Sequence, residues 1–159
     1  MLPEAPGCYG LGFLLPDNRI ISIGSLGECR LDRGRYIYFG SAMGPGGLRA
    51  RIRHHVLPKN KLHWHIDYLL NENTLSFVWY LLGRESMECG WSQGIGQIEK
   101  IGYPITGFGS SDCRSGCTAH LLKIPEGFPN KVISDMLKSV SGNSDLTYIE
   151  GDLLANHVI

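Results

Sequence analysis

Two short segments near the N-terminus, each with a tyrosine close to a glycine, do most to constrain how this chain can fold. Gly7-Cys8-Tyr9 begins a run with period-two alternation, and Tyr38-Phe39-Gly40 ends a second hydrophobic run about thirty residues later. Both segments therefore predict strand ends. The segment that follows is rich in cations: Arg49, Arg51, Arg53, His54 and His55. Aromatic hydroxyls, glycines and cations grouped in this way indicate a site that handles phosphate.

The composition indicates one globular domain without a general attraction to nucleic acid. The chain has 159 residues, of which 43% are hydrophobic and 19% charged, so it can bury a single core and is not extensively disordered. Its 15 Lys and Arg residues balance 15 Asp and Glu residues. A site for a polyanion must then be a local patch.

Targeting signals and disulfides are both unexpected in this sequence. Residues 1–6 lack the features of a secretory signal, and the longest aliphatic and aromatic run, residues 77–82, is too short to span a bilayer. We therefore expect a cytoplasmic protein with no membrane partner. Five cysteines, an odd number, favour free thiols or a metal site over a disulfide framework.

Hydrophobic periodicity predicts an α/β fold of the α+β type, with a small antiparallel three-stranded central sheet flanked by helices and with extra strand and helix elements near the C-terminus. The three strands are residues 7–15, 19–23 and 35–39, the first two forming a hairpin and residues 24–34 a loop. The remaining elements that we predict are a short helix at 63–70, a strand at 75–82, a helix at 86–98 with Ser86 as N-cap, a strand at 118–124 and a helix at 129–140.

The helix predicted at residues 48–56 should present its cations in two rows. Leu48, Ile52 and Val56 form the apolar stripe, and Arg51 and His55 lie along its edge. Arg49 and Arg53 form a more outward row. Together with Lys59 and Lys61 they make a basic patch without an acidic residue, which we interpret as nucleic-acid-binding; a solvated helix face is the alternative.

Two further polar groups are candidates for chemistry. His63 and Asp67 stand four residues apart, so on a helix the carboxylate could orient the imidazole, or both could simply form a polar rim. Cys113, Cys117 and His120, next to Asp112, could hold zinc if a fourth ligand came from Cys89 or His65. Free thiols and a histidine carried on a strand are the alternative.

The order and spacing of these motifs resemble the GIY-YIG nuclease superfamily. Within that superfamily the chain is similar to an uncharacterised archaeal and bacterial family whose members sometimes occur fused to endonuclease III. The similarity rests on these segments: GCYGLGF, YIYFGSAMGPGGLRARIRHH, HWHIDYLL, MECGWSQ and FGSSDC. Cys8 and Phe39 stand where the superfamily motifs more often have isoleucine or valine. The resemblance implies a GIY-YIG-like domain over residues 1–125 and a helical C-terminal extension over residues 126–159, packed on the same domain.

The resemblance also implies roles for individual residues. Tyr9 would act as general base or orient the attacking water, Tyr38 would assist, and Arg51 would clamp the phosphate. His55 matches a histidine common in the superfamily. Glu88 would bind a divalent metal, Mg²⁺ or Mn²⁺, with Glu85 as the rival ligand.

The function that this resemblance implies is metal-dependent hydrolysis of DNA phosphodiester bonds, with a link to DNA repair and to DNA-repair proteins as partners. Two alternatives remain open. One is a catalytically inactive module that binds nucleic acid through the basic patch, and the other is an enzyme acting on a small phosphate-bearing substrate, since a chain without net charge need not favour polymers.

Overall fold

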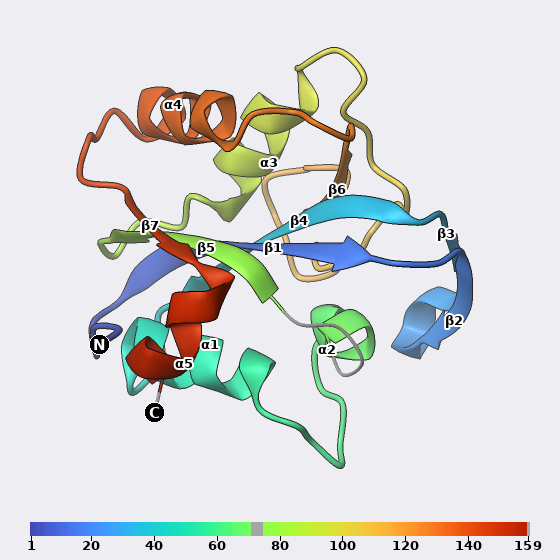
Figure 1. The fold of residues 1–159 in the computed structure, drawn as a ribbon, viewed down its shortest axis with the longest axis horizontal. Helices are drawn as coiled ribbons and strands as arrows, with labels where there is room; N and C mark the ends of the chain where they lie inside the picture. Colours follow the sequence, from blue (N-terminus) through green and yellow to red (C-terminus); the bar gives the residue numbers. More distant parts are fainter. Residues whose placement is uncertain (71–74, 159) are drawn as a thin grey trace.

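The structure, a computed structural model, describes residues 1–70 and 75–158 and is built around one antiparallel sheet (Figure 1). The strands lie in the order β6-β4-β1-β5-β7, and each neighbouring pair is antiparallel. Their bounds are β1 Gly7–Leu15, β4 Gly34–Ala42, β5 Leu75–Leu82, β6 Leu121–Ile124 and β7 Thr147–Glu150. The predicted mixture of antiparallel sheet and flanking helices is confirmed, but the main sheet has five strands and the prediction of three is wrong.

The centre of the sheet is β1, and the burial of β1 explains why the main sheet has more strands than predicted. Of its nine residues Leu14 is exposed and the others are buried. A strand covered on both faces and lying inside a sheet has partners on both edges. Tyr9 pairs with Gly40 of β4 on one side and with Tyr80 of β5 on the other.

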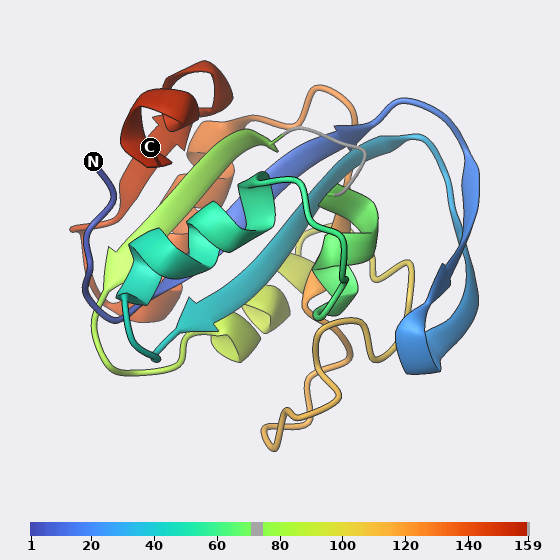
Figure 2. The same cartoon turned by 90° about the horizontal axis from the view of Figure 1, so that it is seen from below.

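The hairpin predicted between the first two strands is also wrong. The strand β2 (Arg19–Ile23) pairs with β3 (Gly27–Leu31) in a separate two-stranded ribbon, and a short 3₁₀ turn, Gly24–Leu26, joins them where a loop was expected. The side chain of Ile20 is 59% exposed. A strand with such alternating exposure is unsuited to a sheet that is covered on both faces, and it forms a ribbon at the edge of the molecule instead (Figure 2).

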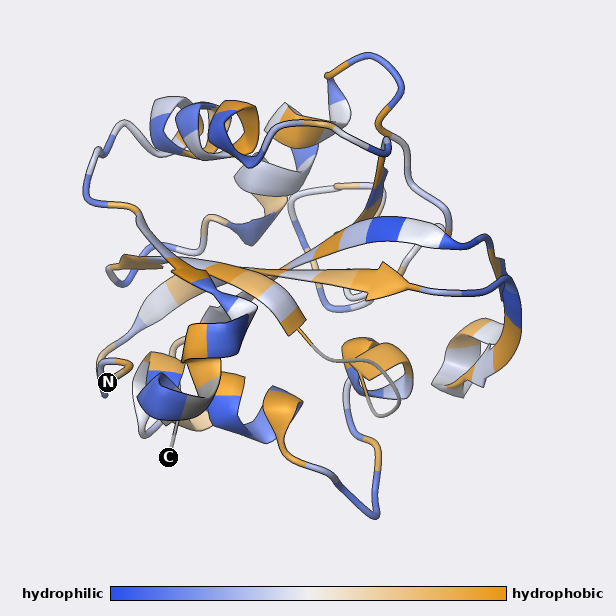
Figure 3. Cartoon of the chain, in the orientation of Figure 1, coloured by the Kyte–Doolittle hydropathy of each residue, from blue (hydrophilic) through white to orange (hydrophobic). Residues whose placement is uncertain are grey.

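Helices cover both faces of the sheet and give three layers (Figures 1 and 2). On one face lie α1 (Gly47–Val56), α2 (His65–Leu70) and α5 (Gly151–Val158); on the other lie α3 (Glu88–Gly96) and α4 (Asn130–Ser141). The core is accordingly divided into two clusters, one containing Tyr9 and the other containing Cys8. Hydrophobic positions gather on the central strands and on the inward sides of the helices (Figure 3).

Most local elements match the sequence predictions to within a few residues, with three informative differences. The second helix begins at His65 and not at residue 63. The third begins at Glu88, with Met87 at the N-cap position and no side-chain cap, so Ser86 is not the N-cap. The C-terminal segment contributes the edge strand β7 to the main sheet in addition to two helices.

The direction of α1 is fixed by the N-terminal segment of the chain. The backbone N–H of Leu48 donates to the carbonyl of Ala5 at 3.0 Å, and that of Arg49 donates to the carbonyl of Pro3 at 3.0 Å. These bonds satisfy amides that a helix start leaves without an intrahelical partner. Gly47, with φ of 53°, allows the approach, because a Cβ atom there would lie 2.2 Å from the Ala5 oxygen. The helix is thereby held beside Tyr9.

Candidate active site

The first element of the site is a chain of three buried side chains from β1, α1 and α2. The Tyr9 hydroxyl lies 2.8 Å from Nε2 of His55, and Nδ1 of His55 lies 3.2 Å from Oδ1 of Asp67. The exposed fractions of these residues are 1% for Tyr9, 1% for His55 and 0% for Asp67. Three segments far apart in the sequence therefore meet in one hydrogen-bonded line.

The carboxylate of Asp67 determines which nitrogen of His55 carries the proton. An ionised carboxylate only accepts hydrogen bonds, so Nδ1 of His55 is the donor to Asp67. Burial lowers the pKa of His55, more than the neighbouring Asp67 raises it, and the imidazole is neutral at pH 7. Its Nε2 is then an acceptor, and the Tyr9 hydroxyl donates to it.

Asp67 is saturated by donors. In addition to His55, its other oxygen accepts from Nε2 of His54 at 3.2 Å and from the backbone N–H groups of His63 and Trp64 at 3.0 Å each. Burial alone would raise the pKa of Asp67, but these hydrogen bonds outweigh it and hold the pKa well below its usual range. Asp67 therefore binds the backbone of His63 and orients His55, where the sequence suggested that it orients the imidazole of His63.

The two motif tyrosines lie close together on neighbouring strands, Tyr9 on β1 and Tyr38 on β4. The ring centroids of Tyr9 and Tyr38 are 6.5 Å apart, and that of Tyr38 lies 6.4 Å from His55. Burial raises the pKa of both hydroxyls above their ordinary value; the positive charge of Arg51 opposes this effect and the negative charge of Glu88 adds to it. Both tyrosines are therefore protonated in the free protein.

Arg51 lies at the half-buried rim of this network. Its Nη1 donates to the backbone carbonyl of Ser41 at 3.2 Å, and its guanidinium carbon lies 4.3 Å from the centre of the Trp64 ring. The planar guanidinium is thus held by a strand end and by an aromatic face. Its charge acts on both tyrosines, which places a cation beside the hydroxyls.

Glu88, the first residue of α3, lies on the opposite face of the sheet from α1. It approaches the same corner of the fold as Arg51, because both side chains contact Ser41 near the end of β4. Its Oε1 accepts from the Ser41 hydroxyl at 3.2 Å, and its Oε2 lies 3.7 Å from Sγ of Cys8. Burial raises the pKa of Cys8 to about 12, so the thiol remains a donor. The side chain of Glu88 is half-buried, whereas that of Glu85 is exposed. A single reachable carboxylate fits Mg²⁺ or Mn²⁺, which take most ligands from water and substrate phosphate.

The other residues singled out from the sequence are distributed around this corner. Arg53, Lys61, His63 and Asp112 are exposed. Arg49 is paired with Glu4 outside the network. The side chain of Lys59 is 9% exposed and lies 3.6 Å from Oδ1 of Asp67, so its ammonium is turned inward and is not spread with the other cations of the patch.

Two residues that hold Glu88 in place, Cys8 and Ser41, were not recognised as site residues from the sequence. The Cys8 thiol accepts from the backbone N–H of Met87 at 3.0 Å and so holds the segment that precedes Glu88, while Ser41 joins Glu88 to the strand. Their position next to the glycine-tyrosine motifs was the available signal. The pairing of Asp67 with His55 had no local signal, because twelve residues and a turn separate them.

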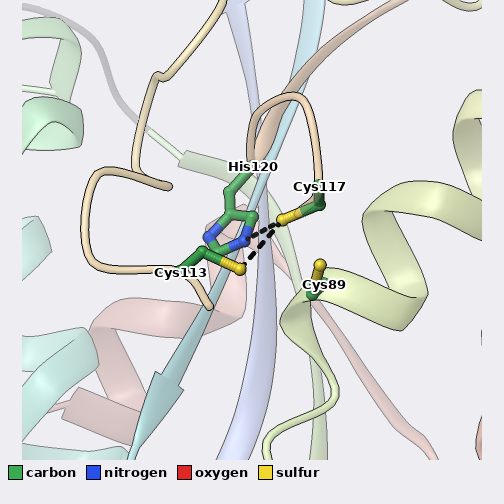
Figure 4. Close-up of side chains that lie close together, drawn as sticks. All are labelled: Cys89, Cys113, Cys117 and His120. Carbon is green, nitrogen blue, oxygen red and sulfur yellow. Dashed lines mark hydrogen bonds between the residues drawn. The ribbon is translucent and has the colours of Figure 1, made fainter. Parts of the chain in front are cut away.

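Within residues 1–70 and 75–158, two groups of side chains have the composition of metal sites. The donor atoms of His54, His55 and Asp67 lie within 4.8 Å of one another, but the Asp67 oxygens are already occupied by the hydrogen bonds described above. The second group contains the three residues noted from the sequence together with the fourth ligand that was needed: Cys89, Cys113, Cys117 and His120. Figure 4 shows these four side chains pointing toward one another.

A cavity of about 1010 Å³ lies away from the tyrosines, at the other end of β4. Its lining includes Arg30, Arg33, Tyr36 and Lys123. Tyr9, His55 and Asp67 do not line this cavity, so the cavity is not the site of the hydrogen-bonded network.

Among the residues that the structure describes, no helix is both long and apolar enough to cross a membrane.

Fold and site together define a mixed α/β protein in which a helix-covered antiparallel sheet carries a buried Tyr-His-Asp network beside the start of its central strand. The chain belongs to the family described as Domain of unknown function DUF123, which matches residues 8–142. No curated protein and no solved structure matches the chain. The matched region runs from β1 to the end of α4 and contains the network, Glu88 and the cysteine cluster.

Proposed function

We propose that this protein is a metal-dependent endonuclease of the GIY-YIG type that hydrolyses DNA phosphodiester bonds, in the context of DNA repair. The observation that carries the proposal is the convergence of Tyr9, His55, Arg51 and Glu88, four residues that the motif resemblance selects, in one corner of the fold. The resemblance was drawn from the order of residues along the chain, and their convergence in space is independent support.

In the reaction that we propose, each residue of the hydrogen-bonded network has a part. Hydrolysis requires that a water lose a proton as its oxygen attacks phosphorus and the bond to the leaving oxygen breaks. The Tyr9 oxygen can take that proton while its own proton passes to Nε2 of His55, and Asp67 stabilises the imidazolium that results. This relay does not require a free tyrosinate, which burial disfavours.

The charges at the rim suit the phosphate. Arg51 offers a guanidinium to the phosphate oxygens, and Glu88 would hold the divalent ion, which when bound neutralises charge on the phosphate and the leaving oxygen. The proposal requires that substrate reach the Tyr9 hydroxyl, which belongs to a side chain that is 1% exposed in the free protein. Arg51 and Trp64 are half-buried, in contact with each other and next to the network, so we expect access to involve a shift of these two side chains.

The test is cleavage of plasmid, single-stranded and branched DNA in Mg²⁺ or Mn²⁺. Tyr9→Phe and Glu88→Gln should each lower the cleavage rate by about 100-fold or more, because each removes a group that acts in the transition state. Tyr36→Phe is the matched control for the tyrosine, since its hydroxyl is also buried but donates to the carbonyl of Asp32. Glu85→Gln is the control for the carboxylate.

Three results would overturn the proposal. The first rejects the catalytic residues, and each of the other two favours one of the alternative functions. If both variants cut as fast as the unchanged protein, the catalytic assignment is wrong. DNA binding that weakens steeply with salt, without cleavage, indicates a binding module, because phosphate contacts release counterions. Absence of binding to any nucleic acid indicates a small phosphate-bearing substrate.

A further inference from the structure

We propose that Cys89, Cys113, Cys117 and His120 bind one structural zinc ion, which joins the segment before β6 to the first turn of α3. The site is distinct from the divalent-metal site at Glu88. Its existence does not depend on nuclease activity, although its consequence for Glu88 rests on the proposed function.

The geometry of the donor atoms fits a single ion. Sγ of Cys113 and Sγ of Cys117 are 3.2 Å apart, Sγ of Cys117 and Nε2 of His120 are 3.0 Å apart, and all four donors lie within 4.8 Å of one another (Figure 4). Zn–S bonds of about 2.3 Å at tetrahedral angles place sulfur atoms about 3.7 Å apart. The sulfur–sulfur separation of 3.2 Å between Cys113 and Cys117 is somewhat shorter than that value, and no pair of donors is more than 4.8 Å apart, so small rotations of the side chains would complete the shell.

The identity of the ligands selects zinc among common metals. Three sulfurs and one imidazole nitrogen form one of the ligand sets that hold structural zinc, whereas Mg²⁺ and Ca²⁺ take oxygen ligands. Four protein ligands fill a tetrahedral shell and leave no position for water or substrate. The ion would therefore have a structural role.

The loop over residues 110–117, which carries two of the four ligands, lacks an apolar anchor. Ser110-Ser111-Asp112-Cys113-Arg114-Ser115-Gly116-Cys117 contains no large apolar side chain that could be buried, and Arg114, Ser115 and Gly116 are exposed. Gly116 has φ of 73°, a left-handed conformation that returns the chain so that Cys117 faces Cys113. A metal ion would hold this loop in place, as buried apolar side chains do in other parts of the chain.

A disulfide explains the cluster less well. The distance of 3.2 Å between Cys113 and Cys117 is longer than the bond of about 2.05 Å in a disulfide, and all five cysteines are free thiols. A bond between these two residues would also leave the convergence of Cys89 and His120 without a reason. These two are the more deeply buried members, 9% and 5% exposed.

The site has a consequence for the catalytic corner because Cys89 directly follows Glu88. The helix α3 is also tied to the segment before β6 by the Ser92 hydroxyl, which donates to the carbonyl of Ala119. Zinc would add a second and stronger attachment at the residue next to the carboxylate, and so hold Glu88 against Ser41. Under the proposed function, Cys89 is a positioning residue for the Glu88 carboxylate.

The test is the zinc content of the purified full chain, measured by elemental mass spectrometry. We expect about one zinc per chain in the unchanged protein and a loss to near zero in Cys89→Ser and Cys117→Ser. Cys29→Ser is the matched control, because Cys29 is a buried cysteine of the β2–β3 ribbon far from the cluster in the chain, and it should retain the metal.

A second measurement decides the matter if a variant fails to fold. In the unchanged protein a strong chelator should increase alkylation of Cys89, Cys113 and Cys117, mapped by peptide mass spectrometry, while Cys29 is unaffected. The proposal is overturned if the unchanged protein contains no zinc after purification in zinc-supplemented medium, if Cys89→Ser keeps its zinc, or if Cys113 and Cys117 are found as a disulfide. None of these readouts uses DNA, so they remain decisive even if no cleavage is observed.

Discussion

At the scale of single residues, Asp67 organises more of the site than either motif tyrosine does. It fixes the tautomer of His55, accepts from His54 and from two backbone amides, and faces the ammonium of Lys59. A buried carboxylate is tolerated when donors surround it in this way. The hydrogen-bond partner of Tyr9 and the start of α2 are therefore both held by the same side chain.

We expect Asp67→Asn to lower the free energy of unfolding by about 3 kcal/mol. The substitution removes the charge and points an amide NH₂ at groups that are themselves donors. Urea denaturation followed by circular dichroism measures the change. Asp145→Asn, at an exposed position, is the control and should shift the value by about 0.5 kcal/mol or less. Equal effects of the two substitutions would show that Asp67 is not buried and paired as described.

At this scale, the sequence predicted the residues that a motif carries and not those that only tertiary contact selects. Tyr9, Arg51 and His55 were found because they belong to the segments on which the family resemblance rests, GCYGLGF and YIYFGSAMGPGGLRARIRHH. The donors around Asp67 and the contact of Cys8 with the segment before Glu88 join residues that are more distant along the chain. Periodicity carries no information about such pairs.

At the scale of elements, the site depends on the close contact between β1 and β4. Gly40 pairs with Tyr9 across the two strands, and the Tyr9 ring lies over it: a Cβ atom at Gly40 would be 2.6 Å from both the Cζ and the hydroxyl oxygen of Tyr9. The glycine of the second motif is therefore required for space and not for backbone flexibility. It lets the tyrosine of the first motif lie flat against the neighbouring strand and reach α1.

Gly40→Ala should displace the Tyr9 ring and break its hydrogen bond to His55. We expect the free energy of unfolding to fall by about 1–3 kcal/mol, the usual cost of overpacking, and DNA cleavage to fall as in Tyr9→Phe. Thermal denaturation and the cleavage assay measure the two effects. Gly44→Ala is the control, because a Cβ atom at Gly44 meets nothing within 4 Å. Full activity in Gly40→Ala would contradict the placement of Tyr9.

Elements with strong local periodicity were predicted well, and pairings between distant strands were not. The helix at Gly47–Val56, the strand at Leu75–Leu82 and the helix at Asn130–Ser141 were located from their apolar spacing. The partners of β1 could not be found in this way, because β5 follows it by about sixty residues and the intervening β2 has the hydrophobicity of a plausible neighbour. The number of strands in the main sheet was therefore underestimated.

At the scale of the whole molecule, the buried network makes stability depend on pH. Burial lowers the pKa of His55 below its ordinary value of 6.5, so the unfolded chain binds a proton more readily than the folded one. The stabilisation is complete above about pH 6.5 and declines as the pH falls toward the folded pKa. Asp67, whose pKa is also lowered, adds a second decline below about pH 4.

Urea denaturation at pH 8, 6.5, 5.5 and 4.5 should therefore show a falling free energy of unfolding below pH 6.5, with at most about 1.4 kcal/mol per pH unit from His55. His55→Gln should have a flatter profile over the same range. Burial also lowers the pKa of His65, so some dependence should remain. A profile that rises on acidification would contradict a neutral, buried His55.

The contact between Arg51 and Ser41 also bears on how copies of this protein behave toward one another. The N–H of Phe39 points away from β1 and donates to the carbonyl of His120, and the carbonyl of Ser41, two residues further on, points the same way beyond the end of β6. The β4–β6 pairing ends at Tyr38, so among the described residues Ser41 has no strand partner on this side, and an unpaired sheet edge can recruit a strand from another molecule. The guanidinium of Arg51 occupies that carbonyl, so Arg51→Ala should increase self-association in light scattering at high protein concentration, whereas Arg53→Ala should not.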